Sequence, residues 1–152
     1  MDQREIILET KEIHKAYKGH EVLRGTTMTV HKGDIYGFVG KNGAGKTTLI
    51  RILSGLSVAD RGSYSLFGIS GDDPNIIKAR RRSCAMVESP AIYPEMTAKE
   101  NMKMQCMILK RSFDCIDEHL RFVGLADTGR RKAKDFSLGM RQRLAIAVAL
   151  IG

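Results

Sequence analysis

The sequence predicts an α/β fold in which a glycine-rich loop joins a buried strand to a helix. Residues 6–17 and 22–30 alternate apolar and polar side chains, a pattern typical of strands. A short apolar run at 35–39 leads into the glycine loop at 40–45, and helical spacing follows it. From residue 97 onward helical spacing dominates. We therefore expect a mixed sheet with an antiparallel β part, followed by an α-helical part.

Length and composition fit a globular protein. The chain has 152 residues, of which 43% are apolar and 28% charged, which suits about one domain. No apolar run approaches the roughly 20 residues that span a bilayer, and the charged start is unlike a signal peptide. The three cysteines are odd in number and lack metal-ligand spacing, which favours free thiols in a reducing compartment.

The net charge of +8 would suit an anionic partner, either nucleic acid or a membrane surface. The basic residues are scattered, with short clusters at 80–82 and 130–132. Aromatic residues do not interleave with them, as a platform for stacking bases would require. We expect a solvated positive surface, in part facing a membrane, and no nucleic-acid partner.

Local patterns predict the order of the elements. Two prolines predict a loop at 88–95, and Thr97 with Glu100 has the spacing of a helix capping box. The methionines that follow are interpreted as the packed face of a helix and not as a cofactor site. The full expectation is strands at 6–17, 22–30, 35–39, 63–67 and 83–87, and helices at 46–56, 74–82, 97–110, 113–123 and 138–151.

The loop from Gly40 to Thr47 matches the phosphate-binding pattern in every fixed position and lies between a predicted strand and a predicted helix. Its glycines let backbone N–H groups converge on phosphate oxygens, and the helix N-terminus adds donors and a favourable dipole. Lys46 would neutralise the β- and γ-phosphates, and the Thr47 hydroxyl would coordinate Mg²⁺. The predicted nucleotide-binding residues are Gly40, Lys41, Asn42, Gly43, Ala44, Gly45, Lys46, Thr47 and Thr48.

A second motif begins at Ser137, a plausible helix N-cap. The apolar residues behind it make a well-capped core helix one interpretation. The other is a second phosphate site, because Ser137 and Gly139 at a helix start offer a hydroxyl and exposed N–H groups. Two phosphate-binding helix starts in one chain suggest a nucleotide held between two copies.

With both motifs in place, the whole chain resembles the nucleotide-binding domain of an ABC transporter, with a P-loop NTPase core and an α-helical signature subdomain. Residues 40–47 resemble the family's Walker A loop, and residues 137–143 resemble its signature. Tyr17 stands where the family places an aromatic ring that stacks on adenine. An ordinary tyrosine at a strand end is the alternative.

Three positions depart from the family's pattern. Leu138 replaces a glycine and Met140 replaces a glutamine in the signature, while Ser137 and Gly139 are kept. Glu88 stands where the family has the glutamine of its Q-loop. A carboxylate there can still hold Mg²⁺ or its water, so the resemblance implies a catalytic part for Glu88 beside Lys46. A solvated loop residue is the alternative for Glu88. These features resemble the bacterial exporters that protect their hosts against lantibiotics and bacitracin-like peptides.

The resemblance implies one ATP-binding domain, incomplete at its C-terminus. We expect a nucleotide-binding core at 1–87, a Q-loop region with an α-helical subdomain at 88–136, and the signature with its helix at 137–152. The family continues with a Mg²⁺-binding aspartate, a catalytic glutamate and a switch histidine, for which this sequence has no candidates. The chain itself is therefore expected to bind nucleotide without efficient hydrolysis.

The implied function is that of an ATPase subunit that couples binding and hydrolysis of ATP, with Mg²⁺, to export of a substrate such as a peptide antibiotic. The implied partners are a transmembrane permease subunit and a second nucleotide-binding domain, in a homodimer or a heterodimer. The implied location is the cytoplasmic face of the cell membrane. The alternative is a non-transport ABC-type ATPase that acts on ribosomes or DNA.

Overall fold

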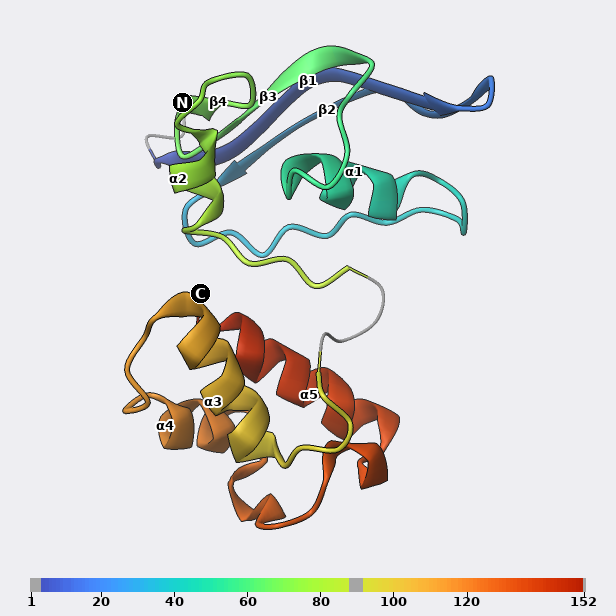
Figure 1. The fold of residues 1–152 in the computed structure, drawn as a ribbon. Coiled ribbons are helices and arrows are strands. Elements are labelled where there is room, and N and C mark those ends of the chain that lie inside the picture. Colours follow the sequence, from blue (N-terminus) through green and yellow to red (C-terminus); the bar gives the residue numbers. More distant parts are fainter. Residues whose placement is uncertain (1–3, 88–91, 152) are drawn as a thin grey trace. The chain divides into compact units, whose positions relative to one another are not determined.

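The computed structural model describes residues 4–87 and 92–151, which form two compact units, Met1–Ser83 and Cys84–Gly152. The first unit contains a sheet and two helices, and the second is helical (Figure 1). Each unit has buried apolar clusters of its own. The α/β fold class predicted from the sequence is confirmed.

The sheet of the first unit has the strand order β2-β1-β3-β4, and every pair is antiparallel. Its strands are β1 (Ile6–Tyr17), β2 (His20–His31), β3 (Arg61–Leu66) and β4 (Ile69–Ser70). A two-residue turn, Lys18-Gly19, joins β1 to β2, and both residues have a positive φ, as this kind of hairpin requires. The sequence pattern predicted the first three strands but missed the two-residue β4.

Two helices pack against this sheet. In α1 (Lys46–Leu53) the buried Leu49 and Ile52 pack with Ile13 and Leu23 of the β1–β2 hairpin. In α2 (Ile76–Arg80) the side chains of Ile76 and Ala79 pack against Leu66. Helix α1 ends three residues earlier than expected, because Gly55 adopts a left-handed φ of 78° that closes the helix.

Two of the expected strands are wrong. The segments 35–39 and 83–87 are not strands, and neither has a strand partner among residues 4–87 and 92–151. An apolar run becomes a strand only when neighbouring strands accept its backbone hydrogen bonds. Without such neighbours the run is open to solvent, with Ile35 fully exposed and Val39 94% exposed.

The second unit packs its helices around one core (Figure 1). Its elements are α3 (Ala98–Leu109), α4 (Ile116–Phe122), η1 (Ala126–Thr128), η2 (Ala133–Asp135) and α5 (Leu138–Ala149). The packed face of α3 is Ala98, Met102 and Cys106, at helical spacing. The predicted packed face of Met102, Met104, Met107 and Ile108 is wrong for Met107 and Ile108, which are both exposed. No helix in the described parts of either unit is long and apolar enough to cross a bilayer.

Candidate nucleotide-binding site

The glycine loop is held by its backbone conformation and by contact with β2. Gly43 and Gly45 both have φ of 83°, and the Ala44 N–H donates to the Lys41 carbonyl at 3.1 Å. A Cβ at Gly45 would lie 2.6 Å from both the Val22 carbonyl oxygen and Leu23 Cδ2. Glycine at this position therefore allows α1 to begin directly against β2.

The first turn of α1 is open to an anion. Gly45 is the N-cap, no side chain caps the helix, and its first turn has no acidic residue. The first N–H groups of a helix have no partners within the helix, and they carry the positive end of the helix dipole. Such a start is suited to bind phosphate.

Lys46 adds a positive charge beside these donors. Its Nζ donates to the carbonyls of Gly40 and Lys41 at 2.5 and 2.8 Å, so the side chain folds back over the loop. Thr47 and Thr48 follow in the first turn and are half-buried, as Lys46 is. The loop thus gathers a cation, two hydroxyls and unpaired helix donors within nine residues, Gly40 to Thr48.

Tyr17 lies at the end of the hairpin that borders this loop. Lys15 pairs with Leu23 in the β1–β2 register, and Leu23 lies against Gly45. Tyr17 is 45% exposed, and the Lys15 ammonium lies 5.5 Å from the centroid of its ring. The Tyr17 hydroxyl lies 3.4 Å from the Ser57 hydroxyl. The ring is therefore exposed at the turn end of the β1–β2 hairpin, and its stacking on adenine stays a prediction.

Asp60 holds this end of β1 in place, a role that the sequence pattern did not predict. Its carboxylate accepts from Lys15 Nζ at 2.6 Å and from the Ala16 N–H at 2.7 Å. The Lys15 ammonium foremost, and then the Ala16 N–H, holds the pKa of Asp60 below its ordinary value. No local pattern announces the contact, because Asp60 lies 44 residues from Ala16 in the sequence.

The signature motif lies in the second unit, at the start of α5. Ser137 is the N-cap and accepts from the Met140 N–H at 3.2 Å, so the capped-helix interpretation describes the observed geometry. Ser137, Leu138 and Gly139 are also exposed, and Met140 is half-buried. A Cβ at Gly139 would meet nothing within 4 Å, so a ligand could approach this backbone closely. The geometry thus agrees both with a capped core helix and with a phosphate-binding helix start.

The basic residues of the signature stretch hold it in place. Arg143 Nη1 donates to the carbonyls of Val123 and Gly124 at 3.2 Å each, which satisfies the end of α4. Arg141 Nη1 donates to the Phe136 carbonyl at 2.5 Å. These residues act as structural links between α5 and the chain before it, a role that the sequence pattern did not predict.

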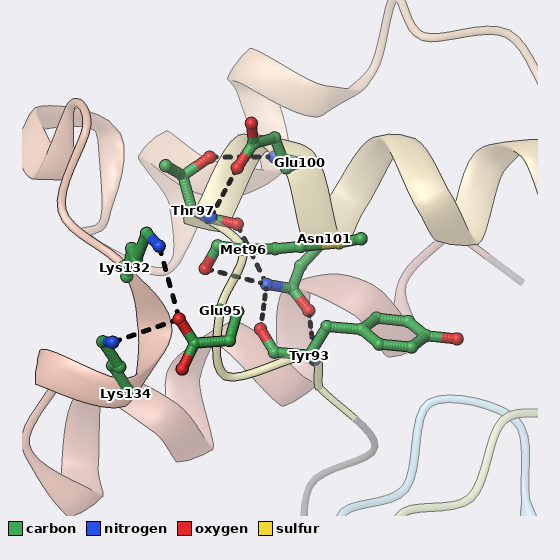
Figure 2. Close-up of polar contacts among 8 residues, drawn as sticks. All are labelled: Tyr93, Glu95, Met96, Thr97, Glu100, Asn101, Lys132 and Lys134. Atoms are coloured by element: carbon green, nitrogen blue, oxygen red, sulfur yellow. Dashed lines mark hydrogen bonds and ion pairs between the residues drawn. The ribbon is translucent and has the colours of Figure 1, made fainter.

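Glu88 lies outside the described residues, but the segment after it is well anchored (Figure 2). The side-chain oxygen of the buried Asn101 accepts a hydrogen bond from the Tyr93 N–H at 2.6 Å. Its side-chain nitrogen donates to the carbonyls of Tyr93, Met96 and Thr97. These contacts fold the segment 93–97 against the start of α3.

Charged side chains fasten the same segment to η2. Glu95 accepts from Lys134 at 3.0 Å and from Lys132 at 3.3 Å (Figure 2). The predicted capping box is confirmed: the Thr97 hydroxyl accepts from the Glu100 N–H, and the Glu100 carboxylate accepts from the Thr97 N–H. The segment 93–97 is therefore held from two sides within the second unit.

The fold and the glycine loop together define an α/β domain of the phosphate-binding, nucleotide-binding class. Residues 23–152 match the family model described as ABC transporter. Because this match covers well over half of the sequence, the chain belongs to the ABC transporter family.

The relatives give the same family. The bacitracin transport ATP-binding protein BcrA of Bacillus licheniformis is 39% identical over 95% of this chain and 47% of its own length. The lantibiotic transport ATP-binding protein SrtF of Streptococcus pyogenes is 35% identical over 95% of this chain and 62% of its own.

A solved structure of an ATP binding subunit of an ABC transporter superposes with a TM-score of 0.78 at 30% identity, over 95% of this chain and 62% of that one. The chain thus spans from about half to under two thirds of the length of these proteins. The resemblance to self-protection exporters is supported by the names of the relatives.

Proposed function

We propose that the chain binds MgATP at the loop 40–48, as part of the ATP-binding subunit of an ABC exporter. The observation that carries this proposal is the start of α1, which has neither a side-chain cap nor an acidic residue and follows a loop held open by glycine. A helix start of this kind has donors to give to a phosphate chain and no internal competitor for them.

Lys46 moves its hydrogen bonds when nucleotide binds. In the structure its ammonium is bound to the carbonyls of Gly40 and Lys41, and in the complex it binds the β- and γ-phosphates. The Thr47 hydroxyl and Glu88 would hold Mg²⁺, whose charge would neutralise the phosphates, and Thr48 would add a donor. The exposed ring of Tyr17 stacks on adenine.

Calorimetric titration with MgATP tests the loop. We expect Lys46→Ala to weaken binding about tenfold or more, because hydrogen bonds to a charged group contribute about 1.5–3 kcal/mol. Lys78→Ala is the matched control: it removes an exposed ammonium from α2, in the same unit but outside the loop 40–48. Unchanged affinity in Lys46→Ala would remove the basis of the proposal.

A second copy of the domain completes the nucleotide site. Ser137 and Gly139 of each copy bind the γ-phosphate held by the other, in a homodimer or heterodimer, with Leu138 and Met140 beside them. The exposed start of α5 and the open space around Gly139 support this arrangement.

A membrane permease receives the motion of the paired domains at the cytoplasmic face of the membrane. The region around Glu88 and helices α3 and α4 form the contact, supported by the rigid anchoring of the segment 93–97 and by Met107 and Ile108, which are exposed on α3. The substrate is a peptide antibiotic, in line with the bacitracin and lantibiotic transport in the names of the relatives.

Drug sensitivity of cells tests the export step. A host that expresses the full-length protein with its permease is expected to tolerate more bacitracin or lantibiotic than one that expresses Lys46→Ala, at equal protein levels. Equal sensitivity, with ATP binding still lost in Lys46→Ala, would reject the peptide substrate and leave the nucleotide site standing.

A further inference from the structure

A cavity of about 220 Å³ in the unit Met1–Ser83 has Arg80 and Tyr64 in its wall. Arg80 comes from the last position of α2 and Tyr64 from β3. Ser57, Ser63 and Asp72 also line the cavity, and no residue of the loop 40–48 does. The cavity thus shares no lining residue with the loop 40–48, although Ser57 in its wall lies 3.4 Å from the Tyr17 hydroxyl.

Two glycines leave room for these side chains. A Cβ at Gly55 would lie 2.6 Å from Arg80 Nη1, and a Cβ at Gly71 would lie 2.4 Å from Cε1 of the Tyr64 ring. Any other residue at Gly71 would displace the ring. The guanidinium and the ring thus lie directly against backbone, which fixes their position at the cavity wall.

Among residues 4–87 and 92–151, the Arg80 guanidinium has no charge partner. One of its amino groups, Nη2, donates to the Tyr64 hydroxyl, but the buried Nε has no hydrogen-bond partner within the described part of the chain. None of the ion pairs formed by described residues includes Arg80. A buried donor without a partner costs free energy, which applies to the Arg80 Nε–H.

The space suits more than a single water molecule. One water occupies roughly 30 Å³ of liquid volume, so a cavity of about 220 Å³ has room for a small polyatomic ion. The Tyr64 hydroxyl accepts from Arg80 Nη2 and keeps its own proton to donate, and Ser63 brings a second hydroxyl to the wall. Arg80 adds the positive charge that an acceptor-rich anion would pair with.

We propose that this cavity is a binding site for a small oxyanion of the phosphate or carboxylate class, which pairs with Arg80. A planar guanidinium matches two oxygens of such an anion, and Tyr64 and the serine hydroxyls complete its shell. The exposed Asp72 carboxylate at the wall opposes a second negative charge, so the site takes one small anion. This site stands independently of the proposed transport function.

The Nε–Hε resonance of Arg80, observed by nuclear magnetic resonance, reports the site directly. Sodium phosphate or sodium acetate is expected to shift this resonance saturably, whereas sodium chloride at equal ionic strength is not. Arg80→Lys should raise the dissociation constant about tenfold or more, read from the amides of Gly55 and Gly71, since the bidentate fork is lost. Tyr64→Phe should weaken binding by a smaller factor.

Variants at other basic side chains test whether the anion binds at Arg80 and not elsewhere on the chain. Lys46→Ala removes the phosphate-loop lysine and Arg81→Gln removes the neighbouring exposed guanidinium, so both should leave the Arg80 shift unchanged. Asp72→Asn should tighten anion binding because it removes a repulsive charge. A shift that chloride reproduces, no saturable shift with either oxyanion, or weaker anion binding in Asp72→Asn would each overturn the proposal.

Discussion

Gly43 and Gly45 have the same φ of 83° in very different surroundings. A Cβ at Gly43 would meet nothing within 4 Å, whereas one at Gly45 would overlap Val22 and Leu23. Substitutions at these two positions of one loop can therefore separate the cost of a left-handed backbone from the cost of steric overlap.

Alanine at each position tests this difference. Gly43→Ala adds only left-handed strain, so it should lower the free energy of unfolding by about 1–2 kcal/mol. Gly45→Ala adds overlap with β2, so its total should reach about 2–5 kcal/mol. Urea unfolding followed by circular dichroism measures both. Equal losses would mean that α1 does not need close contact with β2.

Asn101 organises the segment after Glu88 with one buried amide, which is 3% exposed. Asn101→Ala leaves the Tyr93 N–H without its acceptor and removes one donor from each of three carbonyls that keep a backbone partner, so it should lower the free energy of unfolding by about 1–3 kcal/mol. Asn101→Asp should be at least as harmful, since a carboxylate has no N–H to give to three carbonyls. Asn42→Ala, at an exposed asparagine, is the control and should change stability by less than about 0.5 kcal/mol.

At the scale of elements, structure that depends on neighbouring residues could be predicted from the sequence, and contacts between residues far apart in the sequence could not. The capping box of Thr97 and Glu100 follows from residues three apart, and the structure confirms it. The contacts of Asp60 and Asn101 could not be predicted, because their partners are distant in sequence or are backbone groups that carry no sequence signal. The segment 35–39 was predicted as a strand from its apolar character, but pairing depends on neighbours that no local pattern specifies.

Two substitutions at Ser137, the N-cap of α5, can distinguish its role in helix capping from a role in phosphate binding. Ser137→Ala loses the bond from the Met140 N–H and should destabilise the chain by about 0.5–2 kcal/mol. Ser137→Asp keeps a good cap at a positive helix end, so stability should be retained. The added negative charge should nevertheless weaken ATP-induced dimerisation of the full-length protein, measured by light scattering. Normal dimerisation in Ser137→Asp would assign Ser137 to capping alone.

At the scale of the whole molecule, paired surface carboxylates predict a stability that falls in acid. The Lys15 ammonium and then the Ala16 N–H lower the pKa of Asp60 from 3.8, and the His31 N–H and then Arg4 lower that of Asp34. A carboxyl with a lowered pKa in the folded state stabilises fully above its unfolded pKa, and this contribution disappears as the pH falls through the folded pKa.

The urea midpoint as a function of pH checks this expectation. Wild type should be more stable than Asp60→Asn near about pH 7, and the difference should shrink below about pH 4, where the carboxyl of the unfolded chain takes up its proton. The effect should be small, because Asp60 lies at the surface. A difference that stays constant down to about pH 3 would show that the Asp60 charge does not contribute to folding.

The exposed run at 35–39 has a consequence for the behaviour of the chain at high concentration. Ile35, Tyr36, Phe38 and Val39 present apolar surface next to backbone that no described strand pairs with. Such a segment is a template for intermolecular β-pairing, and one molecule can cover it for another. Solubility of the 152-residue chain is thus expected to be limited by this stretch in spite of its net charge of +8, with aggregation that accelerates steeply as the protein is concentrated.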